Sequence, residues 1–265
     1  MTAPTQHQGK LSELLGKWPK GAVAVQGWLD KQGISRQLTD RYCRFHWMRR
    51  IGRGAYARLN ESVEWPGGLY ALQQQLGLPI HAGAKTALEL QGYAHYIPMR
   101  KGGIQWLFGP PKVKPPAWFL KHEWEDRPRY VATNLFESNP ELGLTKKQIE
   151  DYSIRLSAPE RAMLELLDLL PKSQSFEEAR QLMEGLATLR PELVQQLLEN
   201  CRSIKAKRLF LLLAEICGHQ WLSAVDLKSV DLGKGKRLMV KGGHFDQKFQ
   251  ISTPYERPDI EKIPA

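Results

Sequence analysis

The sequence predicts an α+β fold with two domains, on the basis of three observations. Helix-like and strand-like patterns of apolar residues are mixed along the whole chain. A segment rich in glycine and proline, residues 99–116, separates two regions of different composition. Residues 1–60 contain eleven Lys or Arg and only three acids. Since the net charge of the whole chain is +10, most of the positive excess lies in this segment. We therefore expect a cationic N-terminal domain over residues 1–97 and a larger mixed α/β domain over residues 98–265.

Residues 22–45 predict a helix, a tight turn and a second helix. Within residues 23–32, Val25, Trp28 and Leu29 recur at helical spacing, and Gly33 ends this helix where a positive φ is favourable. The second helix is predicted to begin with Ser35 as N-cap and to end near Phe45. Its apolar face consists of Ile34, Leu38, Tyr42 and Phe45. Its opposite face carries Arg36, Asp40, Cys43 and Arg44, with Gln37 beside them and Arg41 at the apolar border.

Two short alternating segments follow and predict a hairpin. Residues 47–51 and 55–59 alternate as strands do, and a turn centred on Arg53 joins them. Helix, turn, helix and hairpin together indicate a winged helix-turn-helix, whose second helix lies in the major groove of DNA while the wing contacts phosphates or the minor groove. The charge of residues 1–60 favours double-stranded DNA as the partner over a merely solvated charged face. Arg53 is the leading wing candidate, whereas Asp40 needs Arg36, Arg44 or a cytosine amine as its partner.

Helices on either side are expected to support the winged unit. Residues 10–18 predict an amphipathic helix that ends at Pro19. Residues 69–76 and 81–91 predict a helical buttress, in a segment with too few basic residues to bind phosphates itself. We interpret His81 and His95 as structural histidines, because no acid or cysteine lies at metal-ligand spacing from them.

The C-terminal domain is predicted to open with strands and to continue with helices. Capping boxes at residues 157–160 and 175–178 indicate two helix starts, each pairing a serine hydroxyl with a glutamate three residues later. The other expected elements are strands at residues 104–108, 130–136, 237–240 and 245–251, and helices at residues 191–200 and 204–217. The last of these helices is so apolar that it should be central to the core.

Composition and motifs argue against several other functions. The sequence has no run of about 18 apolar residues and no signal peptide, so we expect a cytoplasmic protein with no membrane partner. Cys43, Cys201 and Cys217 form no C-x-x-C pair, and neither a metal, a cofactor nor a disulfide framework is indicated. The motifs of zinc proteases, serine hydrolases, phosphate loops and nucleotidyltransferases are absent, so no catalytic residue is predicted.

Several segments resemble a known protein family. In the N-terminal domain these are GRGAYARL in the wing and LYALQQQLGLPIHAGAKTALELQGYAHYI. In the C-terminal domain they are IRLSAPERAMLELLDLLP, SFEEARQLMEGLATLRPELVQQLLENC and KAKRLFLLLAE. They are similar to the AbiEi-type antitoxins of bacterial type IV toxin–antitoxin systems, and the resemblance covers roughly residues 10–255, nearly the whole chain.

The resemblance implies a non-enzymatic autorepressor and antitoxin with a role in phage defence. The winged domain would bind its own operator, and the C-terminal domain would counter a nucleotidyltransferase-like toxin without requiring a stable complex. Carried over to this sequence, the DNA contacts fall on Arg36, Gln37, Arg41, Arg44, Arg49, Arg50, Arg53 and Arg58. No antitoxin contact is assigned, and Arg161 is the member of the S-A-P-E-R-A motif without a local structural role.

Two alternatives stay open at this stage. A stand-alone winged-helix transcriptional regulator would bind a ligand or a different partner through its C-terminal domain. An enzyme that modifies the toxin would use the charged clusters of that domain, with Asp226, Asp231 and Asp246 as candidates. The oligomeric state and the operator sequence are not indicated by the residues.

Overall fold

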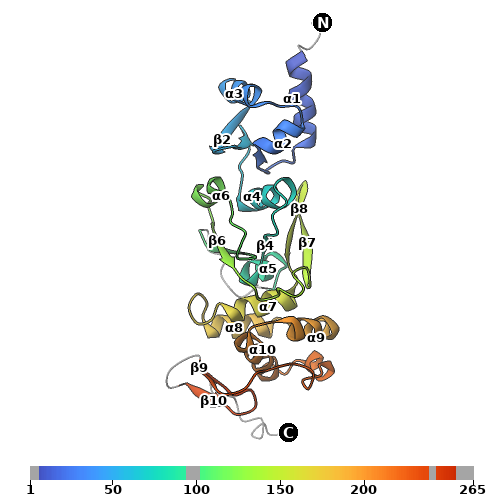
Figure 1. The fold of residues 1–265 in the computed structure, drawn as a ribbon, viewed down its shortest axis with the longest axis vertical. Coiled ribbons are helices and arrows are strands. Elements are labelled where there is room, and N and C mark those ends of the chain that lie inside the picture. Colours follow the sequence, from blue (N-terminus) through green and yellow to red (C-terminus); the bar gives the residue numbers. More distant parts are fainter. Residues whose placement is uncertain (1–5, 94–101, 239–242, 255–265) are drawn as a thin grey trace. The chain divides into compact units, whose positions relative to one another are not determined.

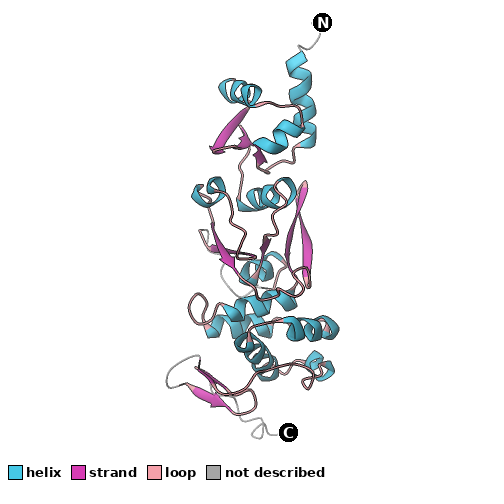
Figure 2. Cartoon of the chain, viewed as in Figure 1, coloured by secondary structure: helices cyan, strands magenta, loops and turns pink. Residues whose placement is uncertain are grey.

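The computed structural model confirms the α+β fold and describes residues 6–93, 102–238 and 243–254 (Figures 1 and 2). The chain divides into two compact units, each assembled from separated segments. The first unit contains Met1–Ala82, Met99–Ala132 and Lys146–Arg155. The second contains Gly83–Pro98, Thr133–Thr145 and Leu156–Ala265. Both units include residues from each side of residue 98, and the division into domains 1–97 and 98–265 stays a prediction.

The N-terminal part of the first unit is a winged helix-turn-helix. Its elements are α1 Gln6–Lys17, β1 Ala24–Val25, α2 Gln26–Lys31, α3 Arg36–Arg44, β2 Met48–Gly52 and β3 Ala55–Arg58. Strand β3 lies between β1 and β2 and is antiparallel to both, so that Tyr56 stands opposite Ala24 and Arg50. The two helices and the hairpin are therefore confirmed. The predicted helix at residues 23–32 begins later than expected, because Ala24 and Val25 pair with β3.

The residues that position α3 act as their types predict. Gly33 has a φ of +76° in the turn before the helix. Ser35 is the N-cap, and its Oγ accepts a hydrogen bond from the backbone N–H of Leu38 at 3.4 Å. Tyr42 is buried as expected, but Phe45 is 57% exposed. The buried face of α3 is completed by Thr39 instead, which leaves Phe45 on the solvent side.

A five-stranded mixed sheet has the strand order β6-β5-β4-β8-β7. The strands are β4 His81–Ala82, β5 Ile104–Gly109, β6 Arg127–Ala132, β7 Leu144–Ile149 and β8 Tyr152–Ser157. Strand β5 is antiparallel to β4 and parallel to β6. The first unit also contains the short helices α4 Trp65–Tyr70, η1 Ala71–Gln75 and α6 Ala117–Lys121.

Three sequence interpretations of this region are wrong in part. Residues 81–91 begin as strand β4 and become helical only at α5 Ala84–Leu90, so His81 belongs to the sheet rather than to a helical buttress. The strand predicted at residues 130–136 lies instead at Arg127–Ala132. Strands β7 and β8 are missing from the prediction, although the buried residues Tyr152, Ile154 and Leu156 alternate along β8.

Helices dominate the second unit. They are α5 Ala84–Leu90, α7 Pro159–Asp168, α8 Phe176–Glu184, α9 Pro191–Asn200, α10 Ile204–Ile216 and the 3-10 helix η2 Gln220–Ala224. Helix α7 packs against α5, α8, α9 and α10. Residues 209–213 are buried, which confirms that α10 is central to the core. The predicted cap at Ser175 is also confirmed, since its Oγ accepts from the N–H of Glu178 at 3.1 Å.

A small three-stranded sheet follows η2. It consists of β9 Arg237–Leu238, β10 His244–Asp246 and β11 Ile251–Thr253. The central strand is β11, which is antiparallel to β10 and parallel to β9. The single strand predicted at residues 245–251 is therefore two paired strands, and the last residues of the strand predicted at 237–240 lie outside the described residues.

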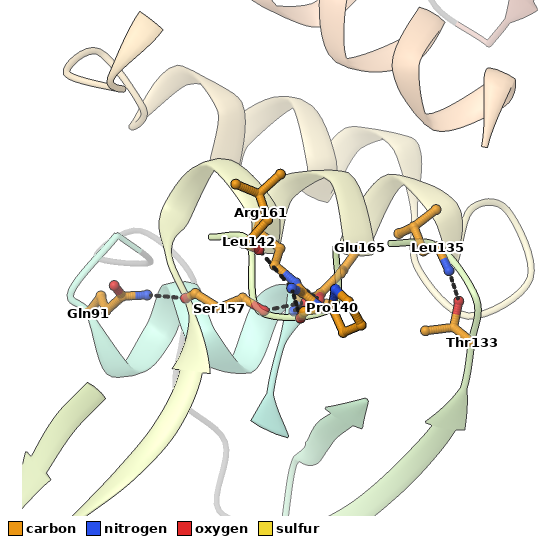
Figure 3. A network of polar contacts seen from close by, with 9 residues as sticks. Gln91, Thr133, Leu135, Pro140, Leu142, Ser157, Arg161 and Glu165 are labelled. Atoms are coloured by element: carbon orange, nitrogen blue, oxygen red, sulfur yellow. Dashed lines mark hydrogen bonds and ion pairs between the residues drawn. The ribbon is translucent and has the colours of Figure 1, made fainter. Parts of the chain in front are cut away.

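Ser157, Arg161 and Glu165 form a buried polar network in the second unit (Figure 3). The carboxylate of Glu165 accepts hydrogen bonds from the Ser157 hydroxyl at 2.7 Å, from Arg161 Nε at 2.8 Å and from the backbone N–H of Ala84 at 3.1 Å. Arg161 also donates to the backbone carbonyl oxygens of Pro140 and Leu142, each at 2.7 Å. These donors and the adjacent guanidinium offset the cost of removing the Glu165 carboxylate from water.

This network corrects two expectations about the S-A-P-E-R-A motif. The N-cap of α7 is Ala158, and Ser157 makes no capping hydrogen bond, because its hydroxyl donates to Glu165. Arg161 was expected to have no local role, yet its guanidinium pairs with Glu165 and lies 4.7 Å from the centre of the Phe136 ring. The motif thus has a structural explanation.

We expect Arg161→Ala to lower the free energy of unfolding by about 3–5 kcal/mol, because it leaves the Glu165 carboxylate buried without its cation. Arg202→Ala is the control, since Arg202 forms an ion pair with Glu137 in which both side chains are more than half exposed. Its removal should cost less than about 1 kcal/mol. Urea denaturation measures both, and equal losses would contradict the structural role of the network.

Candidate nucleic-acid interface

The exposed face of α3 carries a row of polar and cationic side chains. Gln37, Arg41 and Arg44 are spaced by four and three residues, so they lie along one side of the helix. Arg36 is exposed beside them. The side chains of Arg36, Gln37 and Arg44 form no hydrogen bond or ion pair with the part of the chain that the structure describes. Their donors are therefore available to an external acceptor.

The wing contributes two further exposed arginines. Arg53 lies at the tip of the hairpin and has no polar partner among the described residues. Arg50 forms an ion pair with Asp40 of α3, and its guanidinium lies 5.9 Å from the centre of the Tyr56 ring. Asp40 thus has an arginine partner, but it is Arg50 rather than the expected Arg36 or Arg44. This pair ties β2 to α3 and balances one of the charges on the face.

Two of the predicted contact residues point into the protein. The Arg58 side chain is only 15% exposed; it pairs with Glu61 at 3.1 Å and donates to the carbonyl oxygens of Leu15 and Trp18 at the end of α1. Arg49 is half-buried and donates to the carbonyl oxygen of Glu61 at 3.4 Å. These contacts use Nη1 and Nη2 of Arg58 and Nη2 of Arg49 within the fold.

Residues around α6 support the wing strand β2. A Cβ atom added at Gly52 would lie 2.6 Å from the Cβ of Trp118, so α6 approaches the wing backbone closely. His122 stands next to Arg49 and makes a hydrogen bond with the backbone of Ile51. Burial, together with the positive charge of Arg49, lowers the pKa of His122 below its ordinary value. This support was not found from the sequence, because no local pattern marks a contact between residues so far apart.

The histidines and cysteines considered as possible metal ligands show no sign of a metal site where the structure describes them. His81 is buried and stacks on the Phe108 ring, with the ring centres 6.0 Å apart. His95 lies outside the described residues. Cys43, Cys201 and Cys217 are free thiols. In residues 6–93, 102–238 and 243–254, no group of three metal-binding side chains gathers, and no helix has the length and apolar character needed to cross a membrane.

A family model described as "Transcriptional regulator, AbiEi antitoxin, Type IV TA system" matches residues 104–254. A second one, described as "Transcriptional regulator, AbiEi antitoxin N-terminal domain", matches residues 7–99. The chain belongs to the AbiEi antitoxin family. The predicted resemblance to AbiEi-type antitoxins is therefore confirmed, and membership of this family supports a role as a transcriptional regulator and antitoxin.

A similar fold occurs in a solved structure. The crystal structure of the RV2827C protein from Mycobacterium tuberculosis has a TM-score of 0.60 to this chain at 13% sequence identity. The match covers 94% of this chain and 92% of that one. At such an identity the likeness supports the fold alone. No curated protein matches the chain significantly in sequence.

We expect Gly52→Ala to loosen the wing of this AbiEi protein, because the added methyl group would collide with Trp118. Hydrogen exchange at the amides of β2 and β3 should become faster. Gly27→Ala is the matched control, since a Cβ atom there meets nothing within 4 Å and alanine favours the helix α2. Unchanged exchange in the Gly52 variant would show that α6 does not support the wing.

Proposed function

We propose that this AbiEi-family protein represses its own operon by binding operator DNA through α3 and the wing. The observation that carries the proposal is the row formed by Gln37, Arg41 and Arg44, which is exposed on the helix that a winged fold inserts into the major groove. Arg36 and Arg53 extend this row on α3 and at the wing tip. Arginine and glutamine are the residue types that make bidentate hydrogen bonds to guanine and adenine, respectively.

We propose fewer direct DNA contacts than the sequence predicts. We retain Arg36, Gln37, Arg41, Arg44 and Arg53 as direct contacts. Arg50 is paired with Asp40, so a phosphate that contacted Arg50 would share the guanidinium with this carboxylate. Arg49 and Arg58 would act indirectly, by holding the wing in position, because their guanidiniums are used within the fold.

We further propose that residues 98–265 counter a nucleotidyltransferase-like toxin and that the protein has no catalytic activity of its own. The description of the family as a type IV antitoxin and transcriptional regulator supports an antitoxin role without catalysis, whereas the nucleotidyltransferase-like kind of toxin rests on the resemblance noted in the sequence. The buried setting of Ser157, Arg161 and Glu165 also argues that the S-A-P-E-R-A motif serves the fold rather than a reaction. A stable complex with the toxin is not required, and a cytoplasmic location fits DNA as the partner.

The DNA-binding proposal predicts a salt dependence that individual arginines alter. If the four arginines retained as direct contacts each neutralise one phosphate, the slope of log K against log salt should be roughly −3 to −4 for a duplex from upstream of the gene. Arg44→Ala and Arg53→Ala should each weaken binding and make the slope shallower by about 1. Arg202→Ala, an exposed arginine of the second unit, should change neither value. Affinities that match the unsubstituted protein in both test variants would refute the assignment.

The antitoxin proposal is tested by co-expression with the product of the adjacent toxin gene. We expect the full chain to restore growth, and the Arg44→Ala variant to restore it equally when both genes are expressed from a foreign promoter. Loss of DNA binding would then be separated from antitoxin action. Growth arrest that the full chain does not relieve would favour the alternative, a winged-helix regulator whose C-terminal domain binds another partner.

A further inference from the structure

An exposed aromatic pair follows the row of arginines on α3. Phe45 and Trp47 are 57% and 37% exposed, and their ring centres lie 6.0 Å apart. Large aromatic side chains are seldom left exposed together on a soluble protein unless they serve an interaction. Phe45 is four residues after Arg41, so it continues the same side of the helix, and the Arg41 guanidinium lies 5.7 Å from the centre of its ring.

The backbone at the end of α3 holds this pair in one arrangement. The N–H of Trp47 donates to the carbonyl oxygen of Tyr42 and that of His46 to Cys43, which are the two hydrogen bonds of a Schellman motif. His46 takes the left-handed conformation with a φ of +56°, where glycine is usual. The apolar contact of the motif joins Trp47 to Tyr42, with ring centres 5.2 Å apart. Phe45 is not needed for that contact and stays on the outer side.

The charges around the pair favour an anionic occupant. Arg41 and Arg44 precede it on α3, and both are exposed. Arg50 lies on the following strand, β2, where Asp40 balances its charge. A second copy of this chain packed on the patch would bring these cations against one another, whereas a DNA duplex would neutralise them. The apolar group that the major groove offers is the 5-methyl group of thymine.

We propose that Phe45, supported by Trp47, contacts thymine methyl groups in the major groove and so contributes to the choice of operator. This inference rests on the proposed DNA binding by α3. It adds an apolar contact to the hydrogen bonds of Gln37, Arg41 and Arg44. Because such a contact involves no ions, its removal should lower affinity without changing the salt slope.

The test compares two duplexes of the same upstream sequence, one with thymine and one with uracil in its place. Uracil lacks only the methyl group, so phosphate contacts and hydrogen-bonding groups are the same in both. The unsubstituted full chain should bind the thymine duplex about tenfold more tightly. Phe45→Ala should bind the thymine duplex about tenfold more weakly than the unsubstituted chain, keep its salt slope, and no longer distinguish the two duplexes.

Leu76→Ala is the control, because Leu76 is another exposed apolar residue of the first unit and lies outside the winged part. It should leave affinity and discrimination unchanged. Discrimination by Phe45→Ala equal to that of the unsubstituted chain would overturn the inference while leaving DNA binding by α3 intact. A change in sedimentation of Phe45→Ala without DNA would also overturn it, in favour of a contact between copies. Failure of the unsubstituted chain to bind either duplex would instead refute the proposed function.

Discussion

The contacts of Arg58 fix the wing to the body of the winged unit. Its guanidinium reaches from β3 to the carbonyl oxygens at the end of α1 and to Glu61, and it lies 5.9 Å from the centre of the Trp18 ring. A guanidinium that is largely removed from water has to find such partners, since an unpaired buried charge is costly. The hairpin is therefore anchored on the side away from its tip. Arg53 is left exposed at that tip, in the same unit as the row on α3.

The arginines of this segment thus divide by burial into two groups with different tasks. Arg49 and Arg58 hold the hairpin, and α6 adds further support through Trp118. Arg36 and Arg44 keep their donors unused within the described part of the chain. A count of charges cannot make this distinction, because both groups contribute equally to the net charge. The three-dimensional contacts, and not the net charge, show which of these arginines lie exposed on the face of α3 and at the wing tip.

Structural features that neighbouring residues determine could be predicted from the sequence, whereas contacts between residues far apart in the chain could not. The N-cap at Ser35, the turn at Gly33 and the hairpin around Arg53 are all decided by neighbouring residues, and all are confirmed. The role of Ser157 was mistaken, because its partner Glu165 comes from within the following helix rather than from the first turn. Strand β4 was missed for a similar reason, since its pairing with β5 bridges more than twenty residues.

The proposed function depends on α3 and the wing forming one face toward DNA. Hydrogen–deuterium exchange of the full chain, with and without the duplex from upstream of its gene, tests this most directly. We expect the duplex to slow exchange at the amides of residues 36–47 and 50–55 and to leave exchange in helix α9 unchanged. Unchanged exchange over residues 36–55, together with protection confined to the second unit, would contradict it.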